Sequence, residues 1–564
     1  MISISSKKWE EIDIKKNTLE KYKQNLNFSE ILTKLILIRN FDQDEIFSIS
    51  NKIELNNVFL KNKDFIKAVS ILEDSIKKKE YICILGDYDV DGSTATSLLV
   101  RFLDFINHPH FFYIPDRTLD GYGASKKLFE KLILKKPKLF IMVDCGSNSV
   151  DAINFLNEKK IKSIVIDHHE INKPFPKANC IINPKKNNGY QVYDYLCAST
   201  LTYFFLDNIV KKIRSKYKND KFLIYVLIAT VCDVMPLRKL NRLIAIKVLK
   251  EFDISNSYLF KEIYNQMKKN NKININDFGY LIGPILNAGG RLGKPNHATK
   301  LLSTDSEVII KKLIKELINL NEKRKIIENR ILDDIDFNKI NHPQDDIIIL
   351  YEKNINEGLI GIIAARLTEH FDKPSIVITE SNNILKGSAR STPEFNIGNA
   401  VKSAYVSDLL INGGGHSMAA GFTLKKNDFL IFKNFIKDFC IKTNFVKNNK
   451  FKFESVISST AINNDFYDEI KLIEPFGTNN KNPTFLFKKL KIIKPTIVGK
   501  NHVSCFLKSK MGHSTKSIAF NSVKCRLGEY LLNYKKELDV IGQIIENNWN
   551  NKNTLQLSIK DLII

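Results

Sequence analysis

Acidic and histidine side chains follow several short apolar segments, and they are the residues that could do chemistry in this chain. They are Asp87, Asp89 and Asp91 of GDYDVDG (86–92), Asp144, the triplet Asp167, His168 and His169, and Asp233. Carboxylates held close together repel each other, and a divalent cation relieves that repulsion. A mixed set of carboxylates and imidazoles suits Mn²⁺, whereas all-oxygen sites suit Mg²⁺ or Ca²⁺.

The elements that must position these residues are those of a parallel sheet. Short apolar runs at 81–86, 138–146 and 162–170 alternate with helical stretches at 93–106 and 149–160. Apolar strands that alternate with helices predict a parallel sheet with helices on both faces. In such sheets, sites form outside the carboxyl ends of the strands. We therefore expect the acidic and histidine residues on one rim, where they form a metal site.

The rest of the chain predicts further units, because 564 residues are too many for one core. The segment 222–237 predicts a helix that ends near Asp233, and 305–340 has helical spacing throughout, as one long helix or two in series. Alternating short strands after residue 450 predict a small β-barrel. The expected domains are a helical segment (1–75), a catalytic α/β domain (76–245), a helical connector (246–340), a second α/β domain (341–446) and the barrel (450–564).

The formal net charge of +24 is the main compositional feature. Such an excess favours a polyanionic partner, because Lys and Arg neutralise phosphates and release counterions. The chain is also rich in Lys, Ile and Asn, as an AT-biased genome would produce, so many lysines can be plain surface residues.

The eight cysteines show no CxxC spacing, and most stand in apolar runs. This pattern predicts buried free thiols rather than a zinc site or disulfides. We see no apolar stretch long enough for a membrane span and no apolar leader at the N-terminus. The expected protein is therefore cytoplasmic, without a membrane partner.

Five motifs, in their order and spacing, resemble those of the DHH phosphoesterase superfamily. They are GDYDVDG, PDRTLDGYG (115–123), VDCG, VIDHHE and ATVCDVMPL. Further along, GPILNAGGRLG (283–293), KGSARS (386–391) and NGGGHSMAAGF (412–422) resemble the RecJ family, the single-strand-specific exonucleases of bacteria. EPFGTNNKNP (474–483) resembles the entry to the oligonucleotide-binding barrel of that family. The resemblance runs from about residue 75 to the end of the chain.

The resemblance implies a fold and a division of roles. The fold is an α/β parallel-sheet DHH phosphoesterase domain, a long connecting helix, a second, DHH-associated α/β domain and a C-terminal OB-type barrel. The implied metal ligands are Asp89, Asp91, Asp144, His168 and Asp233. His169 is expected to face the substrate phosphate, while Asp87 and Asp167 support the ligands.

Glycine-rich and basic motifs supply the expected phosphate contacts. NGGGHS (412–417) can expose consecutive backbone N–H groups to an anion. As isolated motifs these are weak, since glycine turns are commonplace and PDRTLDGYG can be a salt-bridged loop. The resemblance makes them a clamp for the DNA terminus across a cleft from the metals. The expected phosphate- and DNA-binding residues are Arg117, Tyr122, Asn287, Arg291, Ser388, Arg390, Gly414, Gly415 and His416.

The barrel is expected to bind single strands by charge and by stacking of bases on aromatic rings. Phe476, Phe485 and Phe487 are candidates for stacking, although barrel core is the commoner role for at least two of them. The chain departs from the family pattern at three places: Asn356, where histidine is expected, Asn479 and Asn480, where glycine is more usual, and Ala198-Ser199-Thr200, which replaces a more glycine-rich turn. These departures concern substrate contacts and remove no predicted ligand.

The predicted activity is hydrolysis of single-stranded DNA from the 5′ end to mononucleotides, in DNA repair and recombination. Two divalent ions, Mn²⁺ or Mg²⁺, would activate a water and stabilise charge on the phosphoryl group. The 5′ polarity rests on the resemblance, as do the further partners, a single-strand-binding protein and a RecQ-type helicase. A monomer is expected.

Two alternatives stay open. A phosphoesterase acting on oligoribonucleotides or small nucleotides uses the same chemistry, but such family members usually lack the C-terminal barrel. A non-catalytic single-strand-binding replication subunit is the other alternative, and the retained ligands argue against it.

Overall fold

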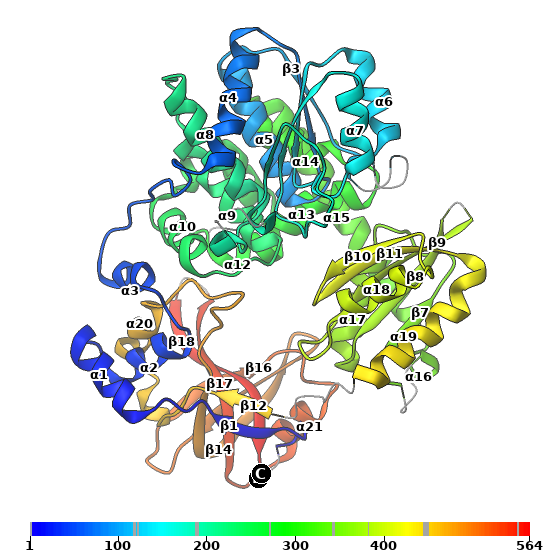
Figure 1. The fold of residues 1–564 in the computed structure, drawn as a ribbon. Helices are drawn as coiled ribbons and strands as arrows, with labels where there is room; N and C mark the ends of the chain where they lie inside the picture. Colours follow the sequence, from blue (N-terminus) through cyan, green and yellow to red (C-terminus); the bar gives the residue numbers. More distant parts are fainter. Residues whose placement is uncertain are drawn as a thin grey trace. The chain divides into compact units, whose positions relative to one another are not determined.

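The computed structural model describes residues 3–116, 120, 123–186, 191–269, 272–340, 345–381, 383–443, 450–549 and 552–564. Contacts divide the chain into two compact units (Figure 1). Unit 1 comprises Met1–Leu55, Pro236–Lys247 and Asn448–Ile564, and unit 2 comprises Asn56–Met235 and Val248–Lys447. The predicted fold class, α/β with a C-terminal barrel, is confirmed.

The first sheet of unit 2 is parallel throughout, as predicted. Its strand order is β3 (His110–Tyr113), β2 (Ile82–Gly86), β4 (Leu139–Val143), β5 (Lys162–Ile166) and β6 (Cys180–Ile182). Every residue of β2 and β4 is buried, because helices cover both faces of the sheet (Figure 1). The covering helices are α4 (Lys63–Lys77), α5 (Val90–Phe105), α6 (Lys126–Leu132), α7 (Val150–Glu158) and α8 (Ala198–Lys212).

Helices follow this sheet along the chain. α9 (Leu223–Cys232) is the apolar helix predicted to end near Asp233. The predicted long connecting helix is α15 (Glu307–Asp334), which has 28 residues. GPILNAGGRLG is not a glycine turn, because its residues Gly283–Arg291 form helix α13. The other helices of this region are α10 (Lys239–Glu251), α11 (Tyr258–Gln266), α12 (Ile275–Asp277), α14 (Asn296–Ser303) and α16 (Phe337–Ile340).

The second sheet of unit 2 is mixed. Its order is β10 (Asn412–His416), β11 (Ala419–Lys425), β9 (Ile384–Arg390), β8 (Ser375–Ser381) and β7 (Ile348–Tyr351), and only β7 and β8 pair in parallel. Helices α17 (Ile360–Phe371), α18 (Ile397–Val406) and α19 (Phe429–Thr443) pack with it. The glycines of NGGGH therefore lie in an edge strand rather than an open loop. In a paired strand, alternate N–H groups point toward the partner, so they are not all offered to one anion.

Unit 1 contains the predicted barrel. Strands β14 (Phe485–Val498), β15 (His502–Lys508), β16 (Ser514–Ala519), β18 (Lys552–Ile563) and β17 (Leu538–Trp549) pair in this order, and the pairing of β14 with β17 closes the ring. Phe485 and Phe487 are fully buried in the barrel core, and Phe476 packs against it. The core role is therefore confirmed for two of the three aromatic candidates, which are not available for base stacking.

The first residues of the chain also belong to unit 1. Strand β1 (Lys8–Glu11) pairs with β12 (Lys450–Phe453), although only helices were predicted before residue 75. The remaining named elements are α1 (Lys16–Leu26), α2 (Glu30–Ile38), α3 (Gln43–Ser50), β13 (Ser455–Val456), α20 (Asn464–Lys471) and α21 (Arg526–Asn533).

The segment Pro236–Lys247 also packs in unit 1. The Arg238 guanidinium donates to both carboxylate oxygens of buried Glu45, each at 2.8 Å. Arg242, which is fully buried, donates to Ser48 Oγ at 2.6 Å and to the Leu472 carbonyl at 3.1 Å. Ion pairs and hydrogen bonds therefore tie this segment to α3 and to the chain that leads into the barrel.

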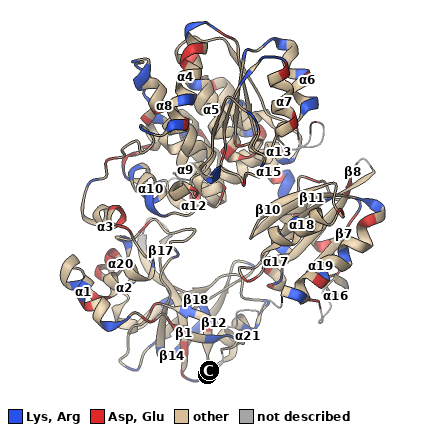
Figure 2. Ribbon diagram, viewed as in Figure 1, with Lys and Arg blue, Asp and Glu red and all other residues tan. Residues whose placement is uncertain are grey.

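The structure bears on the predictions about the cysteines, membrane spans and charge. Six of the cysteines are buried and Cys232 is half-buried, but Cys525 is exposed at the start of α21, so the prediction of burial was wrong for that thiol. Among the described residues, no helix is both long and apolar enough to cross a membrane. Lys and Arg are interspersed with Asp and Glu on helices of both units (Figure 2).

Candidate metal centre

Eight side chains of types that can ligate a metal lie near the carboxyl rim of the parallel sheet. Seven of them form three overlapping groups, and within each group the possible ligand atoms lie within 4.8 Å of one another. The groups are Asp144 with His168 and His169, Asp91 with His168 and Asp233, and Asp87 with Asp89 and Asp144. The five predicted ligands thus lie close together, and Asp87 and His169 also stand where they could hold a metal.

The loop between β2 and α5 presents the first three carboxylates. Asp89 caps α5 and accepts a hydrogen bond from the Gly92 N–H at 3.0 Å. Both oxygens of buried Asp91 accept backbone N–H groups, from Ala198 at 2.7 Å and from Ser199 at 2.8 Å. These donors open α8, whose N-terminus favours a negative charge. Sequence reasoning had flagged Ala198 and Ser199 only as a departure from the family pattern and missed this role.

Two glycines allow close approach to this loop. A Cβ on Gly92 would lie 2.5 Å from the backbone N and O of Asp87. A Cβ on Gly290 of α13 would lie 2.6 Å from the Tyr88 carbonyl oxygen. Gly290 therefore lets α13 pack directly on the acidic loop.

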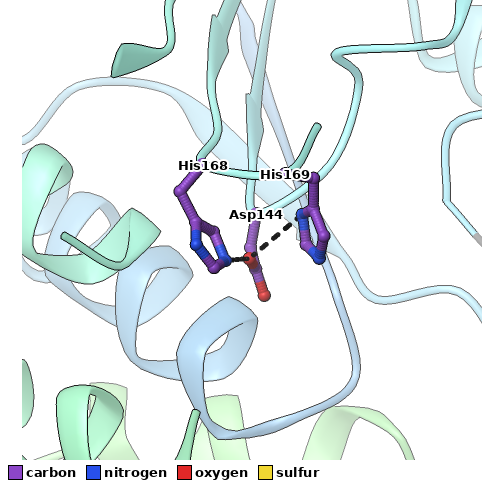
Figure 3. A group of neighbouring side chains, drawn as sticks. All are labelled: Asp144, His168 and His169. Carbon is purple, nitrogen blue, oxygen red and sulfur yellow. Dashed lines mark ion pairs between the residues drawn. The ribbon is translucent and has the colours of Figure 1, made fainter. Parts of the chain in front are cut away.

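Asp144 is the central carboxylate of the cluster. It follows β4 with a left-handed φ of 59°, and its N–H donates to the Ile166 carbonyl at 2.9 Å. A non-glycine residue in this region is strained, and such strain concentrates at functional sites. Its Oδ1 lies 3.2 Å from His168 Nε2 and 3.8 Å from His169 Nδ1 (Figure 3).

The environment of His168 indicates that a cation belongs here. Its Nε2 also lies 3.4 Å from Asp233 Oδ2 and 3.7 Å from Asp91 Oδ2. Yet both nitrogens of His168, Asp144 Oδ1 and Asp233 Oδ2 are buried without a hydrogen-bond partner among the described residues. Buried polar atoms are normally satisfied, and metal coordination satisfies carboxylate oxygens and imidazole together. The residues present therefore fit divalent ions.

The pKa values agree with this fit. Burial, and then the charge of His169, lower the pKa of His168 to about 4, which leaves a neutral imidazole able to ligate. Burial raises the pKa of Asp144 well above its ordinary value, and the charges of Asp91 and its neighbours raise it further. The pKa of Asp233 is raised by the same two causes. Cations would relieve this accumulated negative charge.

Asp167 contacts both histidines. Its Oδ1 accepts the N–H of His168 at 2.8 Å and lies 2.8 Å from Nδ1 of His169. Burial lowers the pKa of His169, but the carboxylates of Asp167, Asp87 and Asp233 together outweigh burial and raise that pKa to about 9. Asn183 was missed by sequence reasoning: its side-chain amide donates to the His169 carbonyl at 2.9 Å and to Ser147 Oγ at 2.8 Å. An Asn-Pro step just after a strand was the available signal.

Those predicted phosphate-binding residues that the structure describes are distributed over α13 and the second sheet of unit 2. Ser388 and Arg390 lie on β9 with their side chains 3.4 Å apart, beside Gly361 of α17. Arg291 donates to the Gly358 carbonyl at 3.1 Å, which joins the end of α13 to the start of the second α/β region.

The remaining residues predicted to bind phosphate or DNA differ in burial and in their neighbours. The His416 ring lies 6.2 Å from the His169 ring, so β10 reaches the metal cluster. Asn287 is half-buried on α13. A Cβ on Gly414 would meet nothing within 4 Å, whereas one on Gly415 would lie 2.3 Å from the Ala419 carbonyl oxygen. Arg117 and Tyr122 lie outside the described residues.

Comparison with known proteins matches three consecutive parts of the chain to family models. Residues 81–230 match the DHH family, N-terminal domain, residues 344–442 match the DHHA1 domain, and residues 453–561 match the RecJ OB domain. The single-stranded-DNA-specific exonuclease RecJ of Bacillus subtilis is 27% identical over 99% of this chain and 71% of its own length. The Thermus thermophilus protein of the same name is 26% identical over 89% of this chain and 71% of its own length.

Solved structures share the fold. RecJ of Thermus thermophilus in complex with Mn²⁺ superposes with a TM-score of 0.83, at 22% identity over 99% of this chain and 79% of that one. A second structure, exonuclease RecJ bound to manganese, has a TM-score of 0.59 at 25% identity and covers 70% of this chain and 98% of that one. The three family matches and the relatives that match along the chain show that it belongs to the RecJ family of the DHH phosphoesterase superfamily.

Proposed function

We propose that this chain is a metal-dependent exonuclease that hydrolyses phosphodiester bonds of single-stranded DNA from the 5′ end and releases mononucleotides. The observation that carries the proposal is the buried cluster around His168, in which both His168 nitrogens, Asp144 Oδ1 and Asp233 Oδ2 have no hydrogen-bond partner among the described residues. The relatives that match the chain along its length are single-stranded-DNA-specific exonucleases.

The proposed ligands of two divalent ions, Mn²⁺ or Mg²⁺, are Asp89, Asp91, Asp144, His168 and Asp233. When bound, such ions supply an activated water and stabilise charge on the phosphoryl group and the leaving oxygen. Asp167 lies 2.8 Å from His169 Nδ1 and orients the ring beside the cluster, where His169 can donate to a phosphate oxygen. Asn183 fixes the backbone of His169, and the α8 N-terminus fixes the orientation of the Asp91 carboxylate.

The other parts of the chain bind the strand in this proposal. Residues 76–245 form the catalytic domain, 341–446 contact the DNA terminus through Ser388, Arg390 and His416, and 450–564 bind the single strand. The net charge of +24 favours such a polyanion. A single-strand-binding protein and a RecQ-type helicase are the proposed protein partners.

The two alternatives fit the chain less well. A phosphoesterase for small nucleotides has no need of the closed barrel that the tail forms. A non-catalytic subunit has no need of the strained and repelling carboxylates around Asp144, which cost folding free energy.

A cleavage assay with end-labelled DNA tests the proposal. The purified protein with Mn²⁺ should release labelled mononucleotide at once from a 5′-labelled single strand. From a 3′-labelled strand it should release label only late, and it should leave a blunt duplex nearly intact. Preferred release from the 3′ end, or equal cleavage of the duplex, would contradict the proposed polarity or strand selectivity.

A further inference from the structure

The Glu170 carboxylate lies between two cationic or potentially cationic groups at the edge of the metal cluster. Its Oε1 is 3.1 Å from the Lys185 Nζ and 4.0 Å from the His416 Nδ1. Lys185 follows β6 of the parallel sheet, whereas His416 ends β10 of the second sheet. One carboxylate oxygen thus lies against groups from both sheets of unit 2.

The backbones around this carboxylate are fixed, while the carboxylate itself is accessible. The Glu170 carbonyl accepts a hydrogen bond from the Asn148 side chain at 2.6 Å, and the Lys185 N–H donates to Asn183 Oδ1 at 2.8 Å. The Glu170 side chain is nevertheless 61% exposed, against 21% for Lys185. The Lys185 ammonium is therefore the more shielded group of the pair, whereas the Glu170 carboxylate is open to solvent.

Lys185 also acts on the metal cluster by charge. Its ammonium helps to lower the pKa values of His168 and His416 and offsets part of the rise in the pKa of Asp233. None of the predictions from the sequence gave Lys185 a role. A lysine that acts on the cluster by charge and is only 21% exposed is suited to bind an anion that arrives at the cluster.

We propose that Lys185 is a phosphate-binding residue of the exonuclease and that Glu170 occupies the phosphate position between Lys185 and His416 in the free enzyme. A phosphate of the incoming strand carries the same single negative charge and displaces the carboxylate. Glu170 thereby holds both sides of the site in a binding arrangement and lowers the affinity for DNA by competition. This inference rests on the proposed function, since the phosphate belongs to the DNA substrate.

Equilibrium binding of a fluorescein-labelled, 5′-phosphorylated oligothymidylate, measured in EDTA so that no cleavage occurs, tests the inference. Glu170→Gln should bind about two- to fivefold more tightly, the range expected when an exposed ion pair no longer competes. Lys185→Gln should bind about tenfold more weakly, because a charged hydrogen bond to phosphate is lost. For this variant, the slope of log Kd against the logarithm of the salt concentration should also be smaller by about 0.7.

Two controls separate competition from a general change of charge. Asp151→Asn removes one negative charge from the exposed first turn of α7 and should change Kd less than Glu170→Gln does. In the double variant with Lys185→Gln, the gain from Glu170→Gln should vanish, since both anions compete for the same ammonium.

The inference fails if Glu170→Gln binds no more tightly than the wild type, or if its gain persists without Lys185. A wild-type protein that cleaves single strands but shows either result would overturn the inference and leave the proposed function standing. A wild-type protein that neither binds nor cleaves single strands would overturn both.

Discussion

Replacing Asp144 by asparagine separates two effects that the buried cluster combines: repulsion between carboxylates and attraction for a cation. Asparagine keeps the shape of the side chain and removes one charge from a position that is 1% exposed. In metal-free protein the loss of repulsion should stabilise the fold. In metal-loaded protein the loss of a ligand should cost stability. The effect of the substitution on the free energy of unfolding should therefore change sign when the metal binds.

The geometry sets the magnitude of this effect. The ligand atoms of Asp87, Asp89 and Asp144 lie within 4.8 Å of one another. At an effective dielectric constant of about 20, two unit charges at that separation repel by about 3.5 kcal/mol. Partial protonation relieves some of this repulsion, so we expect Asp144→Asn to raise the free energy of unfolding of metal-free protein by about 1–3 kcal/mol.

The effect should depend on pH in one direction. Burial and the neighbouring carboxylates raise the pKa of Asp144 in the folded state above its unfolded value. Above pH 4 the folded state therefore binds more protons than the unfolded state, and stability falls as the pH rises toward the raised pKa. Asp144→Asn removes this loss, so its advantage in EDTA should be larger at pH 8 than at pH 5.

Thermal melting of both proteins in EDTA and in Mn²⁺, at the two pH values, measures these quantities. For a unit of several hundred residues, 1 kcal/mol corresponds to about 1–2 °C in Tm. At about 100 times the Kd, Mn²⁺ should stabilise the wild type by about 2.7 kcal/mol. The same concentration of Mn²⁺ should stabilise the variant much less. Equal stabilisation of both proteins by Mn²⁺, or a less stable variant in EDTA at pH 8, would refute the reasoning.

Three further predictions concern backbone packing and buried charge. Gly92→Ala should lower activity about a hundredfold, because its Cβ would lie 2.5 Å from backbone atoms of Asp87 and must displace the ligand loop. Arg39→Met should lower the free energy of unfolding of unit 1 by about 3–5 kcal/mol in urea, since it leaves buried Glu454, now 3.1 Å from the guanidinium, without its charge partner. Burial raises the pKa of Glu474 to about 7, so its ionisation costs stability as the pH rises from about 4.5 through 7. Glu474→Gln should therefore stabilise the protein at pH 8 by about 2–3 kcal/mol and leave it unchanged at pH 4.

Matched controls accompany these variants. Gly279→Ala meets only an ordinary contact at 3.5 Å and should keep full activity, so equal losses in it and Gly92→Ala would contradict the packing argument. Glu11→Gln breaks a more exposed ion pair and should cost less than about 1 kcal/mol. A similarly small cost for Arg39→Met would show that the buried pair contributes little. A gain from Glu474→Gln that is the same at pH 4 and pH 8 would rule out titration as its cause.

The rim of carboxylates could be predicted because it depends on local pattern. Each of three apolar strands is followed directly by its acidic or histidine residue, and parallel strands place their carboxyl ends on one edge. The clustering of Asp144 with His168 therefore needs only the strand ends and the sheet type. Asp233 could be added to the predicted ligands because the apolar helix α9 ends directly before it.

The glycine-rich segments could not be read in the same way, because their structure is set by contacts outside the motifs themselves. Gly413 and Gly415 form an edge strand since β11 offers a pairing register, with Gly413 opposite Phe422 and Gly415 opposite Ala420. Gly290 lies in a helix because the acidic loop approaches it, with Tyr88 as the neighbour. Tyr88 is far from Gly290 in the sequence, whereas β11 follows β10 within a few residues but is itself held by β9, a strand some thirty residues earlier.

Long-range polar contacts explain the other departures from expectation. Asn480 is buried, accepts a hydrogen bond from Arg39 at 3.0 Å and donates to the Ile473 and Pro475 carbonyls. Asn479 adopts a left-handed φ of 58°, a conformation in which glycine is favoured and asparagine is tolerated. The two asparagines at the barrel entry are thus explained by the backbone conformation of Asn479 and by the contact of Asn480 with Arg39 at the end of α2. No pattern within the local sequence reveals this long-range contact.

The most direct test of the central claim is the rate at which single-stranded DNA is degraded in Mn²⁺ by the wild type and by Asp144→Asn. We predict that the wild type removes nucleotides from a 5′-labelled strand and stops on addition of EDTA. Asp144→Asn, folded and melting no lower in EDTA, should be slower by at least about a hundredfold. A variant that retains activity within about tenfold of the wild type would contradict the assignment of hydrolysis to this cluster.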